Sequence, residues 1–173
     1  MKELIQLFTQ IALLRRGPQD LPASLLLLGI AIVGYYGVNL LVISLMPPVS
    51  GWQDEHLEVE VAFTLAWYVV LLRLAGRSER TLQTTTAVFG FWAVLSPLLL
   101  ISQWLVLRFA KDTTWQLPVY FMWLMLVVWI IAANSHVVKA ALEWSSGASV
   151  ALVILQILAR DLLVLSLFPA PAI

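Results

Sequence analysis

Long apolar stretches separated by short polar breaks occupy nearly the whole chain. Their approximate limits are residues 25–46, 59–75, 84–107, 118–138 and 148–168. An α-helix rises about 1.5 Å per residue, so about 20 apolar residues cross a hydrocarbon core about 30 Å thick. The second stretch is short and crosses if its flanking charges reach the headgroups. The pattern predicts an all-α polytopic membrane bundle with about five transmembrane helices.

Composition agrees with this architecture. Of the 173 residues, 61% are hydrophobic and 12% are charged. A membrane β-barrel would alternate polar and apolar residues, and these stretches do not. No soluble insertion is long enough to fold alone, so residues 1–173 are expected to form a single integral membrane domain.

The segment before the first stretch has a helical period of its own. Its apolar residues recur at helical spacing, with polar residues largely opposite, and they are Leu4, Leu7, Phe8, Ile11 and Leu14. Such a pattern is typical of an amphipathic helix in the membrane surface. We therefore expect residues 1–20 to form an interfacial segment whose helix ends at Gly17-Pro18; a simple leader to the first span is the alternative.

Basic residues sort the loops into two groups. One group carries Lys2, Arg15, Arg16, Arg73, Arg77, Arg80 and Lys139. The other carries Arg108 and Lys111 together with the acidic residues Asp54, Glu55, Glu58 and Glu60. The positive-inside rule then predicts a cytoplasmic N-terminus and a periplasmic C-terminus in a bacterial inner membrane.

Arg160 and Asp161 lie just past the middle of the last stretch. Charges at that depth are costly, so they face the bundle interior and find partners. Consecutive helical residues point in different directions, so we expect two separate contacts. Those contacts are Arg160 with Glu58 or Glu60, and Asp161 with Arg108 or Lys111. A helix-locking ion pair is the first interpretation; a transport or proton-relay role, or a contact with a partner subunit, is the alternative.

Other polar residues inside the stretches predict helix packing. They are Asn39, Ser96, Gln103 and His136, and Ser96 and Gln103 share one helical stripe with Thr85 and Trp92. Polar side chains at such spacing hold helices together. A lined cavity beside the stripe, or a ligand at Asn39, is the alternative.

The link between the second and third stretches is basic. Arg73, Arg77 and Arg80 are interpreted as topology determinants that contact anionic headgroups, or alternatively as a docking site for a partner. His56 lies in the acidic loop, for which a solvated loop is the first interpretation and a weak divalent-cation site the second.

The chain lacks the residues that several classes of function require. The chain has no cysteine, which excludes disulfides and thiolate metal sites, and its two histidines, His56 and His136, belong to opposite sides and cannot clamp one haem. Zero net charge indicates no nucleic-acid partner. Nucleophile elbows, HExxH and phosphate-cradling loops are missing. We therefore predict no catalytic residues, no metal site, no cofactor and no enzymatic activity.

The layout resembles the Yip-domain family of five-span membrane proteins and its bacterial relatives. The segments 15–22 (RRGPQDLP) and 76–84 (GRSERTLQT) are similar to segments of small proteobacterial inner-membrane proteins. The long N-terminal region and the Asp-Leu-Tyr-Gly-Pro motif of eukaryotic Yip proteins are missing. The resemblance thus implies the five-helix architecture, without a GTPase partner and without catalytic residues.

Three functions follow as hypotheses. The first is a scaffold, assembly factor or accessory subunit that contacts a membrane-protein partner or another copy of itself within the bilayer, through the N-terminal helix and the 73–80 link. The second is a small transporter or channel component lined by Arg160, Asp161, Gln103 and Asn39. The third is an intramembrane lipid-handling protein.

Overall fold

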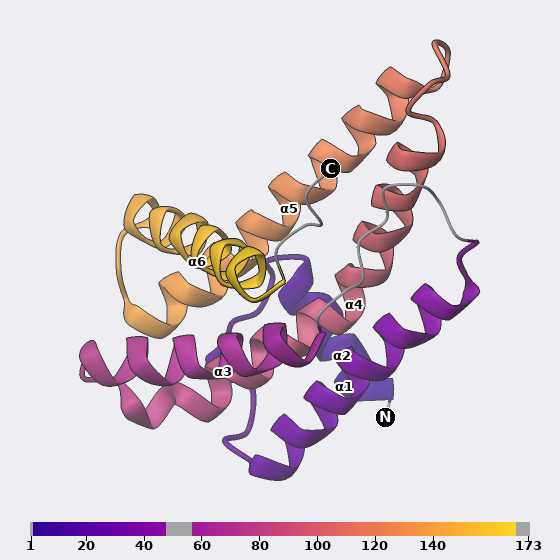
Figure 1. Cartoon of the computed structure of the whole chain (residues 1–173). Helices are drawn as coiled ribbons and strands as arrows, with labels where there is room; N and C mark the ends of the chain where they lie inside the picture. The colour runs from indigo at the N-terminus through magenta and orange to yellow at the C-terminus, as the bar shows by residue number, and fades with distance from the viewer. Residues whose placement is uncertain (1, 48–56, 169–173) are drawn as a thin grey trace.

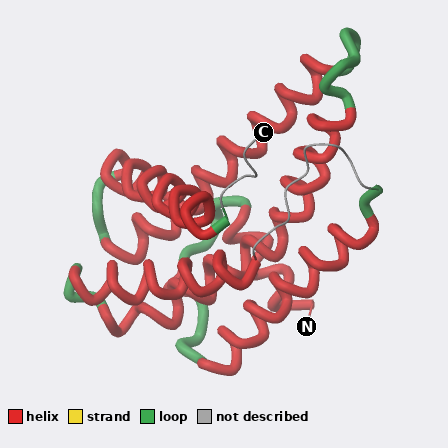
Figure 2. Tube along the Cα trace, in the orientation of Figure 1, coloured by secondary structure: helices red, strands yellow, loops and turns green. Residues whose placement is uncertain are grey.

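The computed structural model describes residues 2–47 and 57–168, and within these ranges every regular element is helical (Figures 1 and 2). The α-helices are α1 (Lys2–Ala12), α2 (Leu25–Leu45), α3 (Leu57–Leu74), α4 (Thr81–Arg108), α5 (Gln116–Leu142) and α6 (Ser146–Leu167). Two short 3-10 turns, η1 (Pro18–Asp20) and η2 (Ser78–Arg80), precede α2 and α4.

Four of these helices are long and apolar enough to cross a bilayer. They are α2, α4 with its preceding turn η2, α5 and α6. Helix α3 is not among them, because its 18 residues include Glu58, Glu60 and Arg73. The described residues therefore form an all-helical bundle compatible with a multi-pass membrane protein, and the predicted count of five spans is not confirmed.

Helix α4 is the centre of the bundle. It contacts α1, α2, α3 and α5, and 61% of its most apolar window is buried, against 22% or less in the other three candidate spans. Its early part lies beside α3 and its later part beside α5, with Pro97 inside the helix (Figure 1). Every residue in the range 84–91 is buried, and most of these residues are small or β-branched. Small side chains let neighbouring backbones approach closely, which explains why this segment forms the core.

The N-terminal helix is shorter than its periodicity predicts. It ends at Ala12, ahead of Gly17-Pro18, because Leu14 adopts a left-handed conformation with φ of 58°. The Arg15 amide then donates to the Gln10 carbonyl, as in a Schellman turn. Leu14 therefore lies outside the helix whose apolar face it was predicted to extend.

Helix α1 turns much of its apolar face toward the protein. Phe8, Ile11 and Ala12 are buried, and α1 contacts both α4 and α5. Three side chains of those helices also hold the segment that leads to α2. Gln83 donates to the Leu21 carbonyl at 2.7 Å, Trp129 donates to the Ala12 carbonyl at 2.8 Å, and the ring of His136 lies 3.2 Å from the Arg16 carbonyl. The amphipathic pattern of α1 thus reflects packing on α4 and α5 as well as any contact with a membrane surface.

Gly90 of α4 packs directly against Phe8 of α1. A Cβ atom at this position would lie 2.2 Å from the ring of Phe8, which is itself buried. We predict that Gly90→Ala lowers the thermal unfolding midpoint in detergent, by overpacking that costs about 1–3 kcal/mol.

Gly34→Ala is the matched control, because nothing lies within 4 Å of a Cβ there. Phe8→Ala should also destabilise the protein, because Phe8 is buried, and the double variant Gly90→Ala with Phe8→Ala should lose less stability than the sum of the two single variants. Equal midpoints for the two glycine variants would contradict close packing at Gly90.

Candidate functional site

Two tyrosines of α2 donate hydrogen bonds to the first turn of α3. The Tyr35 hydroxyl donates to Glu60 Oε2 at 2.8 Å, and the Tyr36 hydroxyl donates to Glu58. Both tyrosines lie near the midpoint of the 21-residue helix α2. The acidic first turn of α3 therefore lies level with the middle of α2, whereas a complete span would place these charges among the headgroups.

Arg160 joins this acidic turn to α6. Its guanidinium donates from Nη1 to Glu60 Oε1 at 2.8 Å, and from Nη2 and Nε to Asp161 Oδ1 at 2.8 and 3.0 Å. The exposed fraction is 29% for the Arg160 side chain, 18% for Glu60 and 53% for Asp161. We call Glu60, Arg160 and Asp161 the charged triad.

The triad agrees with one sequence expectation and differs from another. Arg160 contacts Glu60, one of the two carboxylates expected for it. Asp161 contacts Arg160, whereas Arg108 or Lys111 was expected. The expectation assumed that neighbours on a helix diverge, but the long arginine side chain folds back so that its guanidinium reaches the next carboxylate. Arg108 and Lys111 are exposed at the far end of α4.

A cleft of about 610 Å³ opens next to the triad. All three triad residues line it, together with Tyr35, Asn39, Ser96 and Gln103. Its remaining walls are two indoles and aliphatic side chains, contributed by Trp92, Leu99, Leu100, Trp123, Val127, Ile130, Ile131, Ile157, Val164 and Leu165. The structure thus brings Asn39, Ser96 and Gln103 to the same cavity as Arg160 and Asp161.

Helix α3 contributes little to the cleft. The walls come mainly from the later halves of α2, α4 and α6 and the earlier half of α5, and the contribution of α3 is Glu60 in its first turn. No other described residue of α3 lines the cleft. The cleft therefore occupies the half of the bundle that contains the α4–α5 turn.

The polar walls of the cleft differ in how their groups are bonded. Asn39 donates to the Tyr35 carbonyl within its own helix. The Ser96 hydroxyl is buried and has no hydrogen-bond partner among the described residues. A buried hydroxyl without a partner is costly, so Ser96 is a site where a bound water or ligand would be stabilised.

A second polar cluster lies on the other side of the triad. The fully buried Tyr68 hydroxyl lies 2.8 Å from Asn134 Oδ1 and 3.0 Å from Gln156 Oε1, which joins α3, α5 and α6. None of these three residues was predicted from the sequence as a polar contact. The signal was available, because Glu60, Thr64 and Tyr68 recur every four residues along one stripe of α3.

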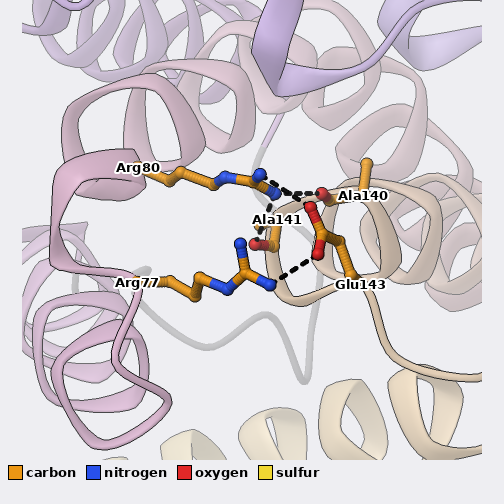
Figure 3. Close-up of polar contacts among 5 residues, drawn as sticks. All are labelled: Arg77, Arg80, Ala140, Ala141 and Glu143. Carbon is orange, nitrogen blue, oxygen red and sulfur yellow. Dashed lines mark hydrogen bonds and ion pairs between the residues drawn. The ribbon is translucent and has the colours of Figure 1, made fainter.

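The basic link has partners inside the protein (Figure 3). Arg77 and Arg80 contact Glu143 at 2.5 and 2.7 Å, and Arg80 also donates to the carbonyls of Ala140 and Ala141 at 3.1 and 3.2 Å (Figure 3). Glu143 follows α5 in a left-handed conformation, which turns its carboxylate toward both arginines. We call these three residues the arginine clamp; it ties the start of α4 to the end of α5.

The clamp also changes one sequence interpretation. The spacing of Lys139 and Glu143 would allow an ion pair between them, but Lys139 donates to Ser146 at 2.9 Å. Arg77 and Arg80, proposed as partner-docking residues, are already in ion pairs, whereas Arg73 is exposed.

No group of metal-ligating side chains gathers in the part of the chain that the structure describes. Asp54, Glu55 and His56 of the proposed weak cation cluster lie outside the described residues.

Comparison of the chain with family models, with curated proteins and with solved structures finds no match. The resemblance to the Yip-domain family therefore rests on the sequence segments and the helix layout alone.

Removing one charge from the triad should lower the stability of the protein. Arg160→Met leaves two carboxylates without a counter-ion, and we expect it to lower stability by about 3 kcal/mol in detergent unfolding. The double variant with Glu60→Gln and Arg160→Met should lose less stability than the sum of the losses of the two single variants, because the two side chains interact directly. Strict additivity would show that the Glu60–Arg160 contact contributes nothing.

The clamp predicts acid sensitivity. The hydrogen bond from Arg80 and the charges of Arg77 and Arg80 lower the pKa of Glu143 in the folded protein. A carboxyl with a lowered folded pKa stabilises the fold above its unfolded pKa, and this contribution is lost as pH falls through the folded value. Wild type should therefore lose thermal stability in that acidic range, and Glu143→Gln should lose less over the same range. Glu3→Gln on α1 is the control, and parallel pH curves for wild type and Glu143→Gln would refute the clamp.

Proposed function

We propose that this chain is a small transporter or channel component that admits a polar solute to the cleft beside the charged triad. The observation that carries the proposal is the cleft itself, which joins three ionisable side chains to Asn39, Ser96 and Gln103 inside a helical bundle. Ionisable residues within membrane helices are candidate functional residues, because they face the bundle interior or a water-filled cavity and mark solute and proton pathways. No catalytic residue is proposed.

The proposed setting is a bacterial inner membrane crossed five times. Gln83 near the start of α4 contacts Leu21 just before α2, so both helices begin at the same end of the bundle. Since α2 and α4 leave from the same end, the chain between them has to return, and α3 forms the described part of that return. Arg15, Arg16, Arg77 and Arg80 cluster at this end, which the positive-inside rule assigns to the cytoplasm. The cleft would then open toward the periplasm.

The scaffold hypothesis receives less support from the geometry. It rested on two contact elements, and both have partners within the chain. Helix α1 packs on α4 and α5, and Arg77 and Arg80 bind Glu143. A membrane-protein partner or a second copy of this chain would have to use other surfaces.

Cysteine accessibility tests the proposal, because the natural chain has no cysteine. Gln103 lines the cleft, whereas Ile101, two residues earlier on α4, is exposed on the outside of the bundle. We expect a membrane-impermeant cationic thiol reagent to label Gln103→Cys about tenfold faster than Ile101→Cys in lipid nanodiscs. The reason is that a lipid-facing thiol ionises poorly, and each unit of its pKa changes the thiolate fraction tenfold.

In sealed vesicles, the label should reach Gln103→Cys from one side. Equal, slow labelling of both cysteines would mean that the cleft is closed to water, and the proposal would fall.

A further inference from the structure

The charges of the ionisable side chains that line the cleft do not sum to zero. Its lining contains two carboxylates, Glu60 and Asp161, and one guanidinium, Arg160. Glu60 is held from two directions, by Tyr35 and by Arg160, and it is the least exposed of the three. Asp161 shares the same guanidinium and keeps 53% of its side chain exposed. When all three groups are ionised, the cleft has one uncompensated negative charge, and Asp161 is the carboxylate best placed to take a ligand.

The other walls show what kind of cation would fit. Trp92 and Trp123 line the cleft with aliphatic side chains around them. Indole faces attract cations, most strongly where water is excluded. Aliphatic walls give a small hydrated ion no compensation for lost water, but they stabilise an apolar body. An anion would meet the excess negative charge, and a neutral apolar molecule would leave Asp161 unused.

We propose that the cleft binds an organic cation, a molecule with an apolar body and one positive charge, with Asp161 as its counter-ion and Trp92 and Trp123 as its aromatic walls. The buried, unpartnered Ser96 hydroxyl in the same cleft is available to a polar group of the ligand or to its water. This inference rests on the proposed function, since it names the solute class of the same cleft.

Two ions of matched shape and opposite charge test whether the cleft prefers a cation to an anion. Tetraphenylphosphonium and tetraphenylborate have nearly the same size and opposite charges. We expect saturable binding of tetraphenylphosphonium to the full-length protein in nanodiscs of zwitterionic lipid, measured by equilibrium dialysis against empty nanodiscs. Tetraphenylborate should show no saturable component above the empty nanodiscs.

Variants then assign the binding to the cleft. Asp161→Asn should weaken tetraphenylphosphonium binding at least about tenfold, because the counter-ion is lost. Glu79→Gln, on the exposed turn η2, changes the net charge equally and should leave affinity unchanged. If Asp161→Asn does not fold, Trp123→Leu provides the second variant: it should weaken binding and reduce the quenching of tryptophan fluorescence by the bound cation.

The outcomes separate this inference from the proposed function. Equal affinity for the two ions, or an unchanged affinity in both Asp161→Asn and Trp123→Leu, would overturn the organic-cation site. If Gln103→Cys is labelled rapidly while tetraphenylphosphonium does not bind, the cleft is open to water and takes another class of solute. If tetraphenylphosphonium does not bind and Gln103→Cys is unreactive, both the organic-cation site and the proposed function are contradicted.

Discussion

An arginine placed deep in an apolar helix needs an opposite charge, and the hydrocarbon core of a bilayer offers none. This constraint organises half of the molecule. Arg160 of α6 obtains Glu60 from the first turn of α3, and Tyr35 of α2 holds the same carboxylate. Three helices therefore meet at one depth. The acidic first turn of α3 lies level with the middle of α2, and the charged triad lines the cleft there.

The opposite half of the bundle is closed by different means. Small and β-branched residues of α4 allow α1, α2 and α5 to approach closely, and Tyr68, Asn134 and Gln156 form a buried polar cluster between α3, α5 and α6. The arginine clamp then ties the start of α4 to the end of α5. A closely packed end and an open end are what a membrane protein needs if it is to admit a solute from one side without a continuous pore.

The amphipathic N-terminal helix shows how one pattern serves two environments. An apolar stripe is equally suited to a membrane surface and to a protein groove, because both remove it from water. The groove beside Gly90 accepts the Phe8 ring, and side chains of α4 and α5 bond the chain that follows. Local periodicity cannot distinguish the two environments, since the distinction depends on residues 62 to 117 positions away along the chain.

Apolar length and isolated charge are local properties, so the sequence alone predicts the helical class, the approximate limits of the long helices and the need of Arg160 for an acidic partner. It also pointed to Asn39, Ser96 and Gln103 as inward-facing polar residues. The partners of these charges depend on the tertiary structure: Glu60 rather than Glu58 meets Arg160, the Arg160 side chain folds back onto Asp161, and Glu143 turns to Arg77 and Arg80 rather than to Lys139. These choices depend on the depth at which each helix starts and on the reach of long flexible side chains, and neither quantity is encoded in the spacing of residues along one helix.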